Sequence, residues 1–125
     1  MKRTGAILEL EVAPYGDTLY LFTDRAKFRR ASKALGAPLE VEFVRRCAGL
    51  CVSSRTNILI GVFGNGLSTL VHELTHALDH IIGFNSLPPV GVNGPSNETA
   101  AFLMEYLFKK CSEALIPQTK PRTSR

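Results

Sequence analysis

The first half of the chain consists of short apolar runs separated by turn-forming residues. Residues 6–12 and 18–22 are rich in apolar side chains and flank the segment Pro-Tyr-Gly-Asp at 14–17, which predicts a β-hairpin. Residues 48–53 and 57–63 predict two further strands, the second of them strongly apolar. Residues 39–44 could form another strand, although apolar and polar positions alternate there only briefly.

Capping residues mark the limits of two predicted helices. The first predicted helix has Asp24 as its N-cap and runs to about Leu35. The second begins just after the last strand, where either Asn65 or Ser68 can cap its N-terminus, and Gly83 is a suitable C-cap. The apolar positions between these limits predict about four helical turns.

A third helix is predicted over residues 98–114, after a Pro- and Gly-containing segment at 84–94 that can reverse the chain and pack this helix against the preceding one. The predicted order is therefore β-β-α-β-β-β-α-α. Grouped strands followed by helices favour an α+β domain, with a small, mainly antiparallel sheet and helices packed on one face. We expect one domain over residues 1–116 and a disordered basic tail over 117–125, which has no apolar content.

The composition is that of an ordinary globular domain. The 125 residues carry a formal net charge of +4 and 45% are hydrophobic. No apolar run approaches the roughly twenty residues that span a bilayer. Glu9 and Glu11 interrupt the N-terminal apolar stretch, so it does not predict a signal peptide. We therefore expect a cytoplasmic protein that does not interact with membranes.

The three cysteines predict reduced thiols, because their number is odd and no secretion signal precedes them. Cys47 and Cys51 have three residues between them, which is not the spacing of a redox pair or a zinc knuckle. A metal-binding pair formed by Cys47 and Cys51 is the less favoured alternative. We expect these side chains, with Cys111, to act as small buried hydrophobic groups.

Basic residues cluster in the first predicted helix and near the C-terminus. The cluster in the helix comprises Arg25, Lys27, Arg29, Arg30 and Lys33, and the second comprises Lys120, Arg122 and Arg125. Such clusters can contact nucleic acid or an acidic partner. No recognition motif or aromatic interleaving accompanies them, so a solvated helix face is favoured and nucleic acid is not expected as a partner.

The second predicted helix contains the pattern His-Glu-x-x-His at residues 72–76. His72 and His76 are one helical turn apart, so their imidazoles lie on the same face and can hold one divalent metal ion. Glu73 follows the first histidine, where it suits a general base acting on a metal-activated water. The alternative is a helix whose His and Glu side chains bond to one another or face solvent.

A catalytic zinc ion usually takes three protein ligands, so the two histidines leave one ligand unassigned. The candidates are Asp79, His80, Glu98 and Glu105. Glu98 fits best, because it lies in the first turn of the third predicted helix, where a carboxylate is favoured by the helix dipole. The alternative for Glu98 is an ordinary acidic residue in a first helical turn.

His80 and Asp79 have two interpretations each. The row from His72 through His76 to His80 drifts around the helix, so a single ion could not easily reach all three. His80 could donate a hydrogen bond at the rim of the site, or it could be a surface histidine near the helix C-terminus. Asp79 could orient a ligand histidine or simply be solvated.

Together, residues 71–79 (VHELTHALD) and 97–103 (NETAAFL) resemble the gluzincin type of zinc metallopeptidase. They are similar in particular to the very short His-Glu-x-x-His proteins found among phage and prophage genes, over roughly residues 56–110. The resemblance implies His72, His76 and Glu98 as ligands of one Zn²⁺ ion and Glu73 as the base. It also implies a minimal zincin-like scaffold and a bacterial host cytoplasm as the location.

Three functions follow from these patterns. The leading hypothesis is a zinc-dependent metallopeptidase that hydrolyses a peptide or protein substrate. The second is a zinc-binding, catalytically inactive interaction protein of phage or prophage origin, which the small size and the missing counterpart of a transition-state His or Tyr favour. The third is a nucleic-acid-associated factor that uses the basic helix. The substrate and the oligomeric state are not specified by the sequence.

Overall fold

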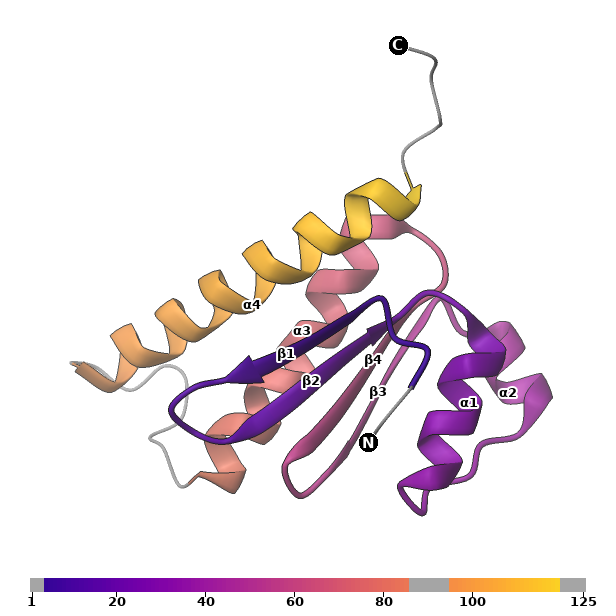
Figure 1. Ribbon diagram of the computed structural model, residues 1–125. Helices are drawn as coiled ribbons and strands as arrows, with labels where there is room; N and C mark the ends of the chain where they lie inside the picture. The colour runs from indigo at the N-terminus through magenta and orange to yellow at the C-terminus, as the bar shows by residue number, and fades with distance from the viewer. Residues whose placement is uncertain (1–3, 86–94, 120–125) are drawn as a thin grey trace, which may run out of the picture.

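A four-stranded sheet with the strand order β1-β2-β4-β3 forms the centre of the fold (Figure 1). The computed structural model describes residues 4–85 and 95–119. The strands are β1 (Leu8–Val12), β2 (Asp17–Phe22), β3 (Gly49–Ser54) and β4 (Asn57–Val62). The helices are α1 (Arg25–Ala34), α2 (Val41–Arg46), α3 (Gly66–Phe84) and α4 (Pro95–Thr119).

Two of the three strand pairings are antiparallel. β1 and β2 form the predicted hairpin, and β3 and β4 form a second one, whereas β2 and β4 run parallel at the centre. The parallel pairing requires the chain to cross over between β2 and β4, and α1, α2 and β3 make up this crossover. The predicted class is thus confirmed: the protein is an α+β domain with a mainly antiparallel sheet, and β1 and β3 are its edges.

Helices cover both faces of the sheet, unlike the expected one-sided arrangement. Leu19, Ile58 and Ile60 belong to a core cluster that includes residues of α3 and α4. Their neighbours in the strands, Tyr20 and Leu59, pack in a second cluster with residues of α1. Because successive side chains of a strand point to opposite faces, α1 lies on the face opposite α3 and α4. The central strands are apolar on both sides, so both faces need a cover.

The segment around residues 39–44 is helical, and the prediction of a strand there was wrong. Helix α2 is stabilised locally by the ion pair between Glu42 and Arg45, with a nitrogen–oxygen distance of 2.7 Å. A side chain from α1 binds the C-terminal end of α2: Arg25 donates hydrogen bonds to the carbonyl oxygens of Val44 and Cys47, at 3.1 and 2.9 Å. The guanidinium thereby adds donors at the C-terminal end of α2, where carbonyl groups lack intrahelical partners; the carbonyl oxygen of Val44 also accepts from the backbone N–H of Cys47, at 3.2 Å.

The N-cap residues of α1 and α3 are at predicted positions. Asp24 caps α1, and its carboxylate accepts a hydrogen bond from the backbone N–H of Lys27 at 2.9 Å. Asn65 precedes α3 in a left-handed backbone conformation, and its side chain makes no capping hydrogen bond. Instead, the hydroxyl of Ser68 donates to the carbonyl oxygen of Asn65 at 3.1 Å.

Both C-terminal helices are longer than predicted. Helix α3 passes through Gly83 and ends at Phe84, so the C-cap is Asn85. Helix α4 packs against α3, as expected, and reaches three residues into the segment expected to be a disordered tail. The remaining residues of that tail, 120–125, and most of the expected reversing segment lie outside the described residues. In the described part of the chain, no helix is long and apolar enough to cross a membrane.

Candidate metal centre

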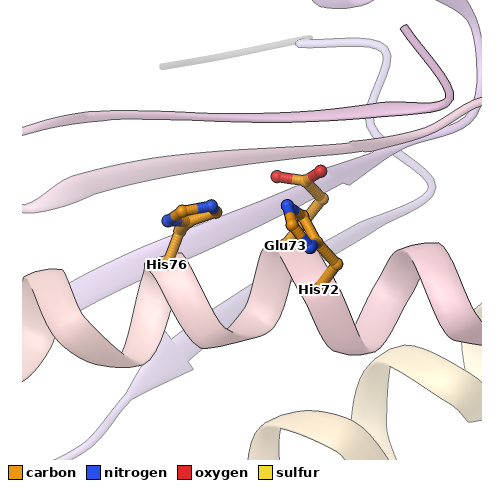
Figure 2. Close-up of side chains that lie close together, drawn as sticks. All are labelled: His72, Glu73 and His76. Atoms are coloured by element: carbon orange, nitrogen blue, oxygen red, sulfur yellow. The ribbon is translucent and has the colours of Figure 1, made fainter.

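His72, Glu73 and His76 come together on one side of α3 (Figure 2). One potential ligand atom from each side chain lies within 4.8 Å of those of the other two. The two imidazole rings are edge-to-face, with 5.1 Å between their centroids. The predicted pairing of the two histidines across one helical turn is therefore present in the structure, and Glu73 lies beside them.

The three side chains differ in exposure. Both histidines are exposed, whereas only 6% of the surface of Glu73 is accessible. The opposite side of α3, which includes Leu70, Leu74 and Ile81, is fully buried in the core. The histidines therefore lie at the margin of the helix, open to solvent, while Glu73 is enclosed between α3 and the sheet (Figure 2).

The edge strand β3 forms the other wall of the site. A Cβ atom added to Gly49 would overlap the Cγ2 atom of Thr69 and come within 3.1 Å of the Cγ atom of Glu73. Two adjoining clefts, of about 420 and 520 Å³, open on either side of this contact, and both include Gly49, His72 and Glu73 in their walls. The site is thus a groove between α3 and β3 that is open to solvent.

The environment of Glu73 favours proton uptake. Burial raises the pKa of its carboxyl group above the ordinary value, and the neighbouring His72 and His76 act in the opposite direction. A raised pKa favours the protonated form of a carboxyl group, and burial is one of the ways in which proteins shift the pKa of acid–base residues.

Glu98 is not part of this group, so the structure does not support the expected third ligand. Glu98 is exposed at the start of α4, and the adjacent Thr99 lines a different cavity together with Pro14 and Tyr15 of the β1–β2 turn. Tyr106, two turns further along α4, donates a hydrogen bond to the carbonyl oxygen of Glu11 in β1, at 3.4 Å. Helix α4 therefore lies along the β1 edge of the sheet, whereas the histidines face the β3 edge.

His80 and Asp79 line the far end of the larger cleft. The Nε2 atom of His80 is hydrogen-bonded to the carbonyl oxygen of Arg55, in the β3–β4 turn, at 2.7 Å. Its ring also stacks on Phe84, with 5.6 Å between the centroids. These contacts hold His80 away from the other two histidines and give it a structural role. Asp79 is exposed and is not part of the His-Glu-His group.

Cys51 also borders the candidate site, although the sequence suggested a metal-binding role for it only as a less favoured pair with Cys47. It lies on β3 and lines the larger cleft together with His72, Glu73 and His76. Burial and the charge of Glu73 raise the pKa of its thiol to about 12. The one signal in the sequence is the alternation Gly49, Cys51, Ser53, which places these three residues on one face of a strand. All three cysteines are free thiols, as expected.

The basic cluster of α1 is partly used inside the protein. Arg25 binds the two carbonyl oxygens at the end of α2, and its guanidinium lies 4.8 Å from the ring centroid of Phe63. Arg29 donates to the carbonyl oxygen of Leu39 at 3.1 Å. Two of the five cations of the cluster thus have structural partners, which weakens the interpretation of this helix as a nucleic-acid surface.

Comparisons with known proteins do not assign a family or a function to this chain. Neither the protein-family models nor the curated proteins nor the solved structures that were compared with the chain give a match. The functional conclusion therefore depends on the groove between α3 and β3 and on the chemistry of the side chains within it.

Proposed function

We propose that the protein is a zinc-dependent metallopeptidase whose site is the groove between α3 and β3. The observation that carries this proposal is the grouping of His72, Glu73 and His76 within 4.8 Å in an open cleft. Two imidazoles and a nearby carboxylate suit zinc best among the common divalent ions. When bound, zinc would lower the pKa of a water ligand to near 7 and polarise a carbonyl group.

Glu73 supplies the acid–base chemistry in this proposal. Its carboxylate takes up the proton that water loses as it attacks the peptide carbonyl carbon, and then transfers this proton to the nitrogen of the departing amine. The amide bond breaks, and a carboxylic acid and an amine are formed. The burial that raises the pKa of Glu73 supports this role, because it leaves the group able to hold the proton between the two steps.

The position of β3 supports a peptide as the substrate. β3 is an edge strand of the described sheet, and it forms one wall of the cleft that contains the histidines. Its outer backbone N–H and C=O groups are available to an extended peptide, which can add to the sheet as a further strand. A peptide bound in this way lies alongside the His-Glu-His group.

The test compares zinc content and cleavage in the wild type, Glu73→Gln, His72→Ala and His76→Ala. We expect the wild type to bind one zinc ion and to cleave members of a peptide library. Glu73→Gln should retain zinc but lose cleavage, and the two histidine variants should lose both. A Glu73→Gln variant that cleaves as fast as the wild type would remove Glu73 from the mechanism, and a wild type that binds no zinc would refute the proposal.

A second function is favoured by the placement of Glu98 away from the site. If Glu73 itself completes the ligand set of His72 and His76, no base remains, and the protein binds zinc without turnover as an interaction module. In that case Glu73→Gln loses zinc, and the wild type binds zinc but is inert toward every peptide tested. The zinc content of Glu73→Gln therefore separates the two functions.

A further inference from the structure

We propose that Cys51 is the third protein ligand of the metal ion bound by His72 and His76. This inference rests on the proposed metal site and adds its missing ligand from β3. Cys51 already borders the cleft that contains both histidines, whereas Glu98 lies outside the His-Glu-His group on a helix whose neighbouring residues contact β1 and the β1–β2 turn.

The direction of the Cys51 side chain follows from the strand register. Cys51 pairs with Ile60 of β4, and both pack in the core cluster that includes α3. The flanking residues Leu50 and Val52 pack in the cluster on the opposite face, with α1. Because adjacent residues of a strand point to opposite faces, the Cys51 sulfur points toward α3.

The position of Cys51 along α3 follows from two contacts on either side of it. Gly49 lies against Thr69 and Glu73, and the carbonyl oxygen of Arg55 binds His80. β3 and α3 therefore run in the same direction. A step of two strand residues rises about 7 Å, which corresponds to about four to five helical residues. Cys51 thus lies near the turn from Glu73 to His76, in agreement with the electrostatic effect of Glu73 on its thiol.

The chemistry of a thiol suits this position. The Cys51 sulfur is not one of the three groups that lie within 4.8 Å of one another, so ligation requires a rotamer change in Cys51 or a histidine. Metal binding would displace the thiol proton to solvent and form a sulfur–metal bond, since a coordinating thiol is deprotonated by the ion. Two imidazoles and one thiolate then leave Glu73 free as the base.

The inference is tested by adding Co²⁺ to the metal-free protein, with all 125 residues, and recording the absorption spectrum. A cobalt–thiolate bond gives an intense charge-transfer band in the near ultraviolet, which cobalt bound to nitrogen and oxygen ligands lacks. We expect this band in the wild type and in the matched controls Cys47→Ser and Cys111→Ser, and its loss in Cys51→Ser. The zinc affinity of Cys51→Ser should fall by at least about 10-fold.

The outcomes separate this inference from the proposed function. Bound Co²⁺ without the near-ultraviolet band in the wild type overturns the role of Cys51 but leaves the metal site intact. A band that persists in Cys51→Ser also overturns it. A wild type that binds neither Co²⁺ nor Zn²⁺ overturns both proposals. If Cys51→Ser does not fold, the test still holds: a band retained in both Cys47→Ser and Cys111→Ser assigns the sulfur donor to Cys51, and a wild type that binds Co²⁺ without the band overturns the inference.

Discussion

Gly49 on β3 lies so close to Thr69 on α3 that no Cβ atom fits between them. This close contact sets the distance between β3 and α3, the two walls of the groove. It lies about one helical turn before His72, so it also sets the width of the groove beside the histidines. A Cβ on Gly49 would also come within 2.8 Å of the carbonyl oxygen of Gly61, which belongs to the backbone of β4 and has little freedom to move.

We therefore expect Gly49→Ala to destabilise the protein by about 1–3 kcal/mol, the usual cost of overpacking. Gly83→Ala is the matched control: Gly83 is helical, exposed and without neighbours within 4 Å of an added Cβ, so alanine should stabilise α3 by up to about 1 kcal/mol. Urea unfolding of the metal-free variants measures both effects. Equal stability of Gly49→Ala and the wild type would contradict the close packing of β3 on α3.

His80 is expected to support the fold without binding metal. His80→Ala removes the hydrogen bond to Arg55 and the stacking on Phe84, so it should lower the free energy of unfolding by about 1 kcal/mol. Its zinc content should equal that of the wild type, whereas His76→Ala should bind none. Elemental analysis beside urea unfolding checks this, and loss of zinc in His80→Ala would assign the residue to the metal site.

The cap of α1 predicts a pH dependence. The backbone hydrogen bond from Lys27 lowers the pKa of Asp24 below its ordinary value of 3.8. A lowered folded-state pKa means that the carboxylate stabilises the folded protein above pH 3.8, and that this stabilisation is lost as the pH falls through the folded-state pKa. Asp24→Ala should therefore cost about 1 kcal/mol at pH 7.

The measurement for Asp24 is urea unfolding of the wild type and Asp24→Ala at several pH values. The difference between them should shrink below pH 3.8. Asp24→Asn is the control, because an asparagine side chain also caps a helix and does not titrate. A difference that stays constant down to the acid transition would show that the charge of Asp24 plays no part.

Thiol reactivity distinguishes two of the cysteines. Cys111 is completely buried in α4, and burial raises the pKa of its thiol to about 12. The thiolate is the reactive form, so Cys111 should resist alkylation of the native protein at pH 8. Cys47, which lines the smaller cleft, should be modified first. Mass spectrometry after a short pulse of iodoacetamide tests this order, with urea-unfolded protein as the control in which both react.

The sequence predicted correctly those features of the structure that depend only on residues close together in the chain. The turn at 14–17 identified the first hairpin, Asp24 identified the start of α1, and the spacing of His72 and His76 identified the helix face that carries the site. Each of these features is set by residues within one turn of chain. The metal and the reaction remain proposals.

The errors concern contacts between distant residues. The C-terminal end of helix α2 is bound by Arg25, which is 19 residues before Val44. The alternation of apolar and polar residues at 39–44 therefore predicted a strand that does not form. Glu98 was predicted as a ligand because it begins the next helix, and it lies outside the His-Glu-His group because nothing in the local sequence specifies along which edge of the sheet α4 packs. The place of Cys51 beside His72 and His76 was not predicted for the same reason, since it depends on β3 being an edge strand that faces α3.

The two walls of the groove come from β3 and α3, which β4 alone separates in the sequence. All the side chains placed in the site therefore belong to one uninterrupted β-β-α stretch, and bringing them together closes only short loops. Such closure costs little chain entropy and is fast. We therefore expect the residues of the proposed site to come together early and locally during folding, whereas β1 and α4 complete the core from the ends of the described chain.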